Sequence, residues 1–140
     1  MIGYPAKIEF DEEDKVYNVR FPDLSGCFTY GESVEEAKEN AREALTGYLE
    51  SIDLRKLKIP KPSGLKGEDI YYIEPEPKVA FAIWLKQKRE YKGYTQEEVA
   101  KILGISYQTY QRFENPTKAN PTLKTITKLE KVLNEKVLQI

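Results

Sequence analysis

"TQEEVAKILGISYQTYQRFEN", residues 95–115, contains two short helix patterns separated by a glycine. Thr95 and Glu98 have the spacing of a capping box, which predicts the start of the first helix. Gly104 is the residue type that commonly ends a helix, and Ser106 is a preferred residue at the start of the next one. Two short helices joined by a glycine turn, with longer helices predicted on either side, indicate a helix-turn-helix domain.

Apolar residues at helical spacing predict the core of this domain. They are Val99, Ala100, Leu103, Tyr110 and Phe113 in the two short helices, and Leu123, Ile126, Leu129, Val132 and Leu133 in a later helix. Part of the later stripe is also a candidate dimer interface. Ile83 and Trp84, which precede the motif, are expected to be core or dimer contacts and not to stack on bases.

The segments TQEEVAKILGIS and RFEN resemble the helix-turn-helix of the Cro and phage-repressor type, over about residues 79–134. The resemblance implies that Gln96 contacts phosphate and that Tyr107, Gln108 and Arg112 face base edges, with the following loop returning to the DNA backbone. The expected DNA-contacting residues are Gln96, Ser106, Tyr107, Gln108, Gln111, Arg112, Asn115, Lys118 and Asn120. The implied partner is operator DNA, double-stranded and palindromic, bound by a homodimer or homotetramer.

Two other residues match this repressor type, and two depart from it. Arg89 and Glu114 match a structural salt bridge, so we expect them to stabilise the domain as a partly buried pair. Tyr110 stands where an aliphatic residue is usual, and Pro116 replaces a common glycine. The path of the loop after the second short helix is therefore less well predicted than the helices.

The first half of the chain alternates apolar and polar residues, which indicates strands, and then changes to a helical period. The predicted elements are strands at 4–10, 15–23, 26–31 and 69–73 and a helix at 33–53. Ser33 and Glu36 form a second capping box at the start of that helix. The order strand-strand-strand-helix-strand predicts an α+β domain, a small antiparallel-rich sheet with one long helix, beside the all-α helix-turn-helix domain.

The segments YPAKIEF, FPDLSGC and the helix ending in YLE resemble the N-terminal domain of the HicB antitoxin family, over about the first 75 residues. The resemblance implies a truncated ribonuclease H-like fold without that enzyme's metal-binding carboxylates. It also implies a protein partner, the HicA toxin, a small ribonuclease that the HicB domain binds and silences. Because a protein that binds RNA should be basic, an acidic HicB surface would be steered towards it.

Charge and proline content divide the chain into two parts. Up to Lys78 there are 11 Lys and Arg and 17 Asp and Glu, which gives a net charge of −6. From Val79 onward there are 11 Lys and Arg and 6 Asp and Glu, which gives a net charge of +5. The basic part is the one suited to a polyanion. Prolines around the last strand indicate a boundary. We predict a toxin-binding domain at 1–74, a linker at 75–78 and a DNA-binding domain at 79–140.

Composition argues against most enzyme classes. The chain has no histidine and one cysteine, so the usual zinc spacings and histidine-based nucleophilic sites are missing. Acidic residues follow Cys27 and would not activate a thiolate, which makes it a small half-buried strand residue. We expect no catalytic residue, metal or cofactor. The absence of a long apolar run and the charged stretch near the start predict a cytoplasmic protein without membrane contact.

Three functions are compatible with these patterns. The first is an antitoxin that occludes HicA and autoregulates its operon. The second is a one-component helix-turn-helix regulator whose first domain senses a small molecule or mediates oligomerisation. The third is a residual metal nuclease that would depend on Asp11 or Asp23, although the acidic residues around them read more simply as a solvated face.

Overall fold

A computed structural model describes residues 1–137 of the chain. The chain forms two compact units: one spans Ile2–Glu76, and the other begins at Pro77 and also includes Met1. We call them the sheet unit and the helical unit. Within residues 1–137, none of the helices combines the length and the apolar character that crossing a bilayer requires.

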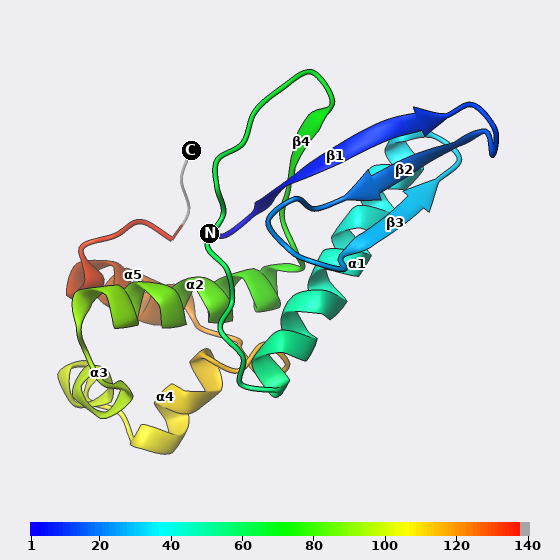
Figure 1. The fold of residues 1–140 in the computed structure, drawn as a ribbon. Coiled ribbons are helices and arrows are strands. Elements are labelled where there is room, and N and C mark those ends of the chain that lie inside the picture. Colours follow the sequence, from blue (N-terminus) through cyan, green and yellow to red (C-terminus); the bar gives the residue numbers. More distant parts are fainter. Residues whose placement is uncertain (138–140) are drawn as a thin grey trace. The chain divides into compact units, whose positions relative to one another are not determined.

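The sheet unit is a four-stranded antiparallel sheet with one long helix (Figure 1). Its elements are β1 (Tyr4–Asp11), β2 (Val16–Arg20), β3 (Phe28–Gly31), α1 (Val34–Leu54) and β4 (Ile70–Ile73). The strands lie in the order β3-β2-β1-β4, so β1 pairs with both β2 and β4. The predicted order of elements and the α+β class are confirmed, although β2 ends at Arg20 and not at residue 23.

Alternation along β1 builds the core of the sheet unit. Tyr4, Ala6 and Ile8 are buried, and α1 lies along one face of the sheet (Figure 1). The buried stripe of α1 consists of Ala37, Ala41, Leu45, Leu49 and Ile52. α1 approaches β3 so closely that a β-carbon on Gly31 would stand 2.4 Å from the backbone nitrogen of Ala37. Glycine is therefore required at the end of β3 by the packing of the helix.

Residues 21–27 close into a loop between β2 and β3. The Phe21 N–H donates to the Cys27 carbonyl at 3.1 Å, and the Cys27 N–H donates to the Leu24 carbonyl at 3.1 Å. Cys27 is 4% exposed, and burial raises the pKa of its thiol to about 11. Because the thiolate is the reactive form, Cys27 serves here as a core residue.

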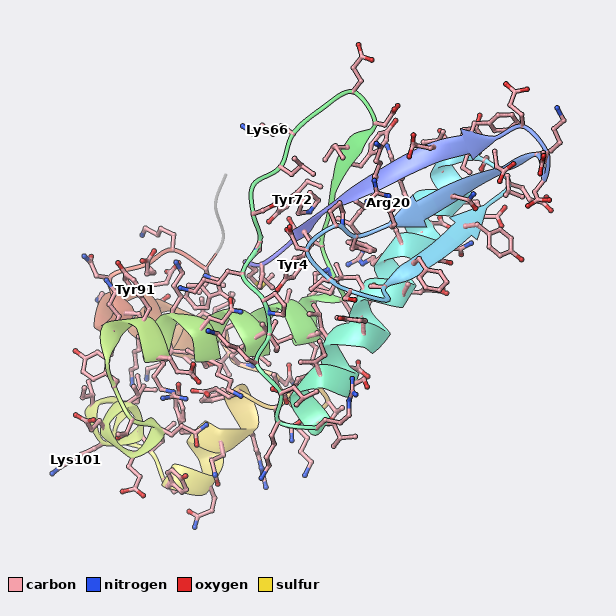
Figure 2. The ribbon with its side chains drawn as sticks, in the orientation of Figure 1. Tyr4, Arg20, Lys66, Tyr72, Tyr91 and Lys101 are labelled. Carbon is pink, nitrogen blue, oxygen red and sulfur yellow. The ribbon has the colours of Figure 1, made fainter. Side chains whose placement is uncertain are left out.

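Hydrogen bonds tie the long loop between α1 and β4 to the rest of the sheet unit. The Tyr4 hydroxyl donates to the Pro60 carbonyl at 2.5 Å, and the Ser63 N–H donates to the Asp23 carboxylate at 2.8 Å. Figure 2 shows Tyr4 beside this loop and Lys66 further along it. These bonds give a defined path to a segment that has no regular secondary structure of its own.

The helical unit contains α2 (Pro77–Lys92), α3 (Gln96–Leu103), α4 (Tyr107–Phe113) and α5 (Leu123–Leu133). α2 begins at Pro77, so residues 77 and 78, which the sequence assigned to a linker, belong to a helix. The physical reason is that proline suits the first helical position, where its missing N–H costs no hydrogen bond and its fixed φ is already helical.

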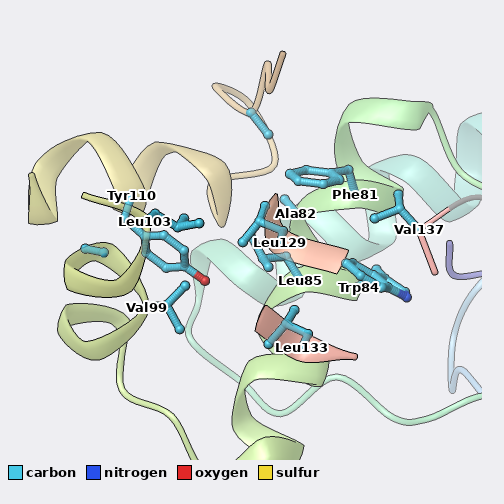
Figure 3. Close-up of a cluster of buried hydrophobic side chains, with 12 residues drawn as sticks. Phe81, Ala82, Trp84, Leu85, Val99, Leu103, Tyr110, Leu129, Leu133 and Val137 are labelled. Carbon is cyan, nitrogen blue, oxygen red and sulfur yellow. The ribbon is translucent and has the colours of Figure 1, made fainter. Parts of the chain in front are cut away.

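The core of the helical unit lies between its four helices (Figure 3). Its buried members are Phe81, Ala82, Trp84, Leu85, Val99, Ala100, Leu103, Tyr110, Ala119, Leu129, Leu133 and Val137. Trp84, the only tryptophan in the chain, stacks on Phe81 with ring centroids 6.4 Å apart. The stripe predicted on α5 is divided, because Leu129 and Leu133 are buried whereas Leu123 is 81% exposed.

Candidate nucleic-acid interface

Local capping fixes where α3 and α4 begin and where α3 ends. The Thr95 hydroxyl accepts the Glu98 N–H at 3.1 Å and the Glu98 carboxylate accepts the Thr95 N–H at 3.0 Å, which confirms the predicted capping box. Gly104 ends α3 with a φ of 72°, a conformation that glycine adopts without strain. The Ser106 hydroxyl then accepts the N–H of Thr109 and starts α4.

A buried ion pair joins α2 to the end of α4. Arg89 Nε donates to Glu114 Oε2 at 2.6 Å, and Arg89 Nη2 donates to Glu114 Oε1 at 3.0 Å. The predicted ion pair is confirmed, and at 8% and 5% exposed its residues are more completely buried than expected. Burial would lower the pKa of Arg89, but its hydrogen bonds to Glu114 and the charge of that carboxylate outweigh burial and raise it.

Tyr110 donates its hydroxyl to the same carboxylate, at 2.5 Å from Glu114 Oε2. Its side chain is fully buried, and burial, followed by the negative charge of Glu114, raises the pKa of the Tyr110 phenol. The sequence predicted Tyr110 as a core residue and as an unusual aromatic at its position, but not this hydrogen bond. Two signals point to it: the spacing of four residues between Tyr110 and Glu114, and the need of a buried tyrosine hydroxyl for a partner.

Gln96 connects this buried cluster to the surface. Its Nε2 donates to Glu114 Oε1 at 3.0 Å, and its Oε1 accepts from the Tyr107 hydroxyl at 3.3 Å. Gln96 is half-buried at the start of α3, whereas Tyr107 is exposed at the start of α4. One of the two amide N–H groups of Gln96, the residue expected to contact phosphate, is therefore bonded to Glu114.

Four of the predicted residues share the exposed face of α4. They are Tyr107, Gln108, Gln111 and Arg112. Positions 107 and 111, and 108 and 112, are one helical turn apart, so their side chains are neighbours on the helix surface. The buried Tyr110 faces the core instead. This exposed face carries a phenol, two amides and a guanidinium, which are groups that hydrogen-bond to base edges in the major groove of DNA.

The loop after α4 is shaped by Asn115. Its Oδ1 accepts from the N–H of Thr117 at 3.0 Å and from the hydroxyl of Thr117 at 2.8 Å, and its carbonyl accepts the N–H of Lys118 at 3.0 Å. Asn115 and Ser106, both expected to contact DNA, thus have their side chains bonded within the local turns. Lys118 and Asn120 are exposed in this loop.

Charge on the helical unit favours a polyanion. The chain from Val79 onward has a net charge of +5, and its exposed cations include Lys101 on α3, Arg112 on α4 and Lys118 in the next loop. Figure 2 shows Lys101 projecting away from α3. Phosphate groups are the polyanion that such a combination of cations and amides suits best.

Asp11 and Asp23, on which the metal-nuclease alternative depends, hold backbone groups in place. Asp11 Oδ1 accepts the N–H groups of Asp14 at 3.1 Å and Glu13 at 2.9 Å, and these bonds lower the pKa of Asp11. Asp23 accepts the N–H of Ser63. Across residues 1–137 no three Asp, Glu or Cys side chains gather as a metal site requires. The geometry therefore gives this alternative no support.

Comparison with known proteins identifies the family. Residues 4–125 match the HicB-like antitoxin of bacterial toxin–antitoxin systems. Antitoxin HicB 2 of Photorhabdus laumondii is 32% identical over 109 residues, which cover 78% of this chain and 75% of that protein. The SPbeta prophage-derived HTH-type transcriptional regulator YonR of Bacillus subtilis is 49% identical over 49 residues, which cover 35% of this chain and 44% of that protein.

Among solved structures, the Burkholderia pseudomallei antitoxin HicB aligns with a TM-score of 0.46 and 25% identity, covering 53% of this chain and 63% of that one. The family match is the stronger finding, since it extends from β1 through α4 and into α5. With more than half of its length matched, and with a relative aligned over three quarters of that relative's own length, the chain belongs to the HicB-like antitoxin family of bacterial toxin–antitoxin systems.

Proposed function

We propose that this chain is an antitoxin that binds and silences a HicA-like ribonuclease, and that it represses its own operon by binding operator DNA. The observation that carries the proposal is the extent of the family match, which includes most of both compact units. In this proposal the sheet unit binds the toxin and the helical unit binds DNA. Both tasks are binding reactions in the cytoplasm and require no catalysis by this chain.

The acidic character of the sheet unit supports toxin binding. Exposed carboxylates lie on the β1–β2 hairpin, at Glu9, Glu12, Glu13 and Asp14, and on α1, at Glu35, Glu36, Glu39 and Glu43. A ribonuclease that binds RNA carries positive charge, so opposite charge accelerates the encounter and suppresses wrong partners. We assign to this unit the truncated ribonuclease H-like fold of the family domain, used as a binding surface that occludes the toxin.

The outward residues of α4 support DNA binding. We propose that the helical unit is a Cro-type helix-turn-helix domain with α4 in the major groove, where Arg112 can pair with guanine and Gln108 with adenine. Gln96 and the loop with Lys118 and Asn120 would contact phosphates. Because one such domain reads few base pairs, we propose a homodimer or homotetramer on a palindromic operator.

Coexpression tests the toxin arm. The chain is produced with the product of the small open reading frame next to its gene, and copurification and growth are followed. We expect a small basic protein to copurify and its toxicity to disappear. A fragment of residues 1–76 that is shown by circular dichroism to be folded should protect equally well, whereas residues 77–140 should not. A folded fragment that neither binds nor protects would contradict the proposed division of tasks.

Operator binding by Arg112→Ala tests the DNA arm. We expect a loss of about 1 to 3 kcal/mol in binding free energy and a relaxed preference at one base position, because a guanidinium that pairs with a base is removed. Lys124→Ala, an exposed lysine on α5, is the control and should keep all base preferences. Equal weakening on every DNA sequence would make Arg112 a phosphate contact instead.

The similarity to the regulator YonR favours a second candidate function. In this case the chain is a one-component transcriptional regulator, and the sheet unit is a small-molecule sensor or an oligomerisation module. The same coexpression experiment distinguishes the two functions. If the chain is such a regulator, it should bind its promoter DNA, while no protein copurifies with it and growth is not protected.

A further inference from the structure

We propose that the hydroxyl oxygen of Tyr107 determines specificity as a hydrogen-bond acceptor, and therefore selects a base that offers an amino group, adenine or cytosine. The relay of hydrogen bonds Arg89–Glu114–Gln96–Tyr107 imposes this polarity. The inference rests on the DNA-binding function proposed above and adds to it the chemical class of the base that one residue reads.

The relay begins with the charge of Glu114. Two hydrogen bonds from Arg89, at 2.6 and 3.0 Å, form a two-pronged ion pair in which the carboxylate is ionised. An ionised carboxylate has acceptors and no donor. Every group that contacts Glu114 must therefore donate to it, as Tyr110 also does at 2.5 Å.

The orientation of the Gln96 amide follows from that charge. Its Nε2 lies 3.0 Å from Glu114 Oε1. A flipped amide would place a carbonyl oxygen against the carboxylate oxygen, with no proton between them, so the flipped form is disfavoured. The Gln96 Oε1 atom is thereby directed away from Glu114, and it presents an acceptor to the start of α4.

The polarity of Tyr107 follows in turn. A tyrosine hydroxyl has one proton, and the Tyr107 hydroxyl donates it to Gln96 Oε1 at 3.3 Å. Its oxygen lone pairs are then the groups that Tyr107 offers to a further partner. In the major groove adenine and cytosine present amino donors, whereas guanine and thymine present carbonyl acceptors. Tyr107 should therefore favour adenine over guanine, or cytosine over thymine, at the position it meets.

This inference distinguishes Tyr107 from its neighbours on α4. Gln108 has both a donor and an acceptor at the end of its side chain, and Arg112 has donors alone. A phenol by itself has both and selects weakly. The bond to Gln96 removes one of the two options, so a buried ion pair between α2 and α4 sets the polarity of a surface residue.

Selection from a random DNA pool tests the relay with the full chain. The wild type, Tyr107→Phe, Gln96→Leu and the control Gln108→Ala are compared, and their folding is checked by Trp84 fluorescence. We expect one position at which the wild type prefers an amino base by about tenfold over its carbonyl counterpart. Tyr107→Phe should lose that preference alone. Gln96→Leu should weaken or reverse it, because the hydroxyl is then free to donate, and Gln108→Ala should alter a different position.

A modified operator gives a second readout. Replacing the selected base by an analogue without its exocyclic amino group should weaken the wild type about tenfold and leave Tyr107→Phe unchanged. If Tyr107→Phe keeps every base preference, or if Gln96→Leu keeps the preference that Tyr107→Phe loses, the relay is wrong while DNA binding stands. If the wild type enriches no sequence at all, the proposed DNA-binding function fails, and the inference fails with it.

Discussion

Glu114 accepts hydrogen bonds from three side chains, those of Arg89, Tyr110 and Gln96. Removing its charge leaves the buried guanidinium of Arg89 with only the exposed carboxylate of Glu90, 3.8 Å away, which costs far more than a surface pair is worth. We expect Glu114→Gln to lower the free energy of unfolding of the helical unit by about 3 kcal/mol. Urea unfolding followed by Trp84 fluorescence measures this unit specifically, because the chain's only tryptophan lies in its core.

Glu90→Gln provides the matched control for that measurement. Its carboxylate lies 3.8 Å from Arg89 Nη2 and its side chain is 57% exposed. Since exposed pairs contribute little, the control should change the free energy of unfolding by at most about 0.5 kcal/mol. If both variants lower the free energy of unfolding by similar amounts, the buried Arg89–Glu114 pair contributes no more to stability than the exposed Arg89–Glu90 pair.

The Cys27 thiol is expected to react slowly in the folded protein. Burial raises its pKa to about 11, so the fraction of Cys27 present as thiolate at pH 8 is about two orders of magnitude smaller than for a free thiol. A chromogenic disulfide reagent should therefore label it only after unfolding in urea. Rapid labelling of the folded chain would contradict this expectation.

The same pKa shift should make the stability of the sheet unit depend on pH. The unfolded thiol loses its proton at a lower pH than the folded one, so the contribution of Cys27 to the free energy of unfolding should decline between about pH 9 and 11.

Residue-level contacts were predictable where they depend on local spacing or on a known pattern. The Thr95–Glu98 capping box and the Arg89–Glu114 pair are of this kind. The contact between Gln96 and Tyr107 was not, since it joins the first residues of two helices and depends on the exact path of the intervening turn. The spacing of residues in the sequence does not predict a hydrogen bond between two side chains that are eleven positions apart on either side of a turn.

At the scale of elements, the contact between β3 and α1 is a tight constraint in the sheet unit. A methyl group at Gly31 would meet the backbone of Ala37, which cannot move aside as a flexible side chain would. We expect Gly31→Ala to destabilise the sheet unit by about 3 kcal/mol. Amide hydrogen exchange in β1, β2 and β3 provides the measurement, and it should show faster opening of all three strands.

Gly47→Ala is the counterpart within the same unit. Gly47 lies inside α1, and apart from its chain neighbours and the backbone of its own helix, a β-carbon there would have no atom within 4 Å. Alanine is the better helix former, so this variant should stabilise the unit by about 0.5 to 1 kcal/mol and slow the same exchange. If Gly31→Ala destabilises the unit while Gly47→Ala stabilises it, the steric constraint lies at the contact between β3 and α1.

Element type and order followed from hydrophobic period, but two boundaries did not. Residues 21–23 continue the alternating pattern of β2 in the sequence. The strand nevertheless ends at Arg20, because the Phe21 N–H donates to the Cys27 carbonyl within the following loop. Pro77 belongs to the predicted linker, whereas it is the first residue of α2. Proline ends one element and starts another equally well, and local sequence does not distinguish these roles.

At the scale of the whole molecule, the opposite charges of the two halves should make binding sensitive to salt. We expect operator affinity to fall by on the order of a hundredfold or more between about 50 and 200 mM salt, through release of counter-ions from DNA. Lys118→Gln should reduce the slope of log affinity against log salt by about one, because one phosphate is no longer neutralised. Lys15→Gln, which makes the same charge change in the β1–β2 turn, should leave the slope unaltered. Equal slopes for the two variants would mean that Lys118 binds no phosphate.

Proline content and net charge both change near residues 75–78, and the boundary between the two compact units lies between Glu76 and Pro77. The outward residues of α4 could also be predicted, because burial of one helix face determines which side chains remain exposed. Surfaces for another protein are harder to predict. Exposed carboxylates on the hairpin and on α1 have no period that separates a binding surface from a solvated one.

The buried thiol between β2 and β3 also makes the chain easy to equip with probes. Cys27 is the only cysteine, and it is neither exposed nor ionised near neutral pH. A cysteine introduced at an exposed position such as Lys124 would therefore be the single reactive thiol, with no need to replace the native one. A fluorescent dye attached there would let encounters with DNA or with a toxin be followed in real time on an otherwise native protein.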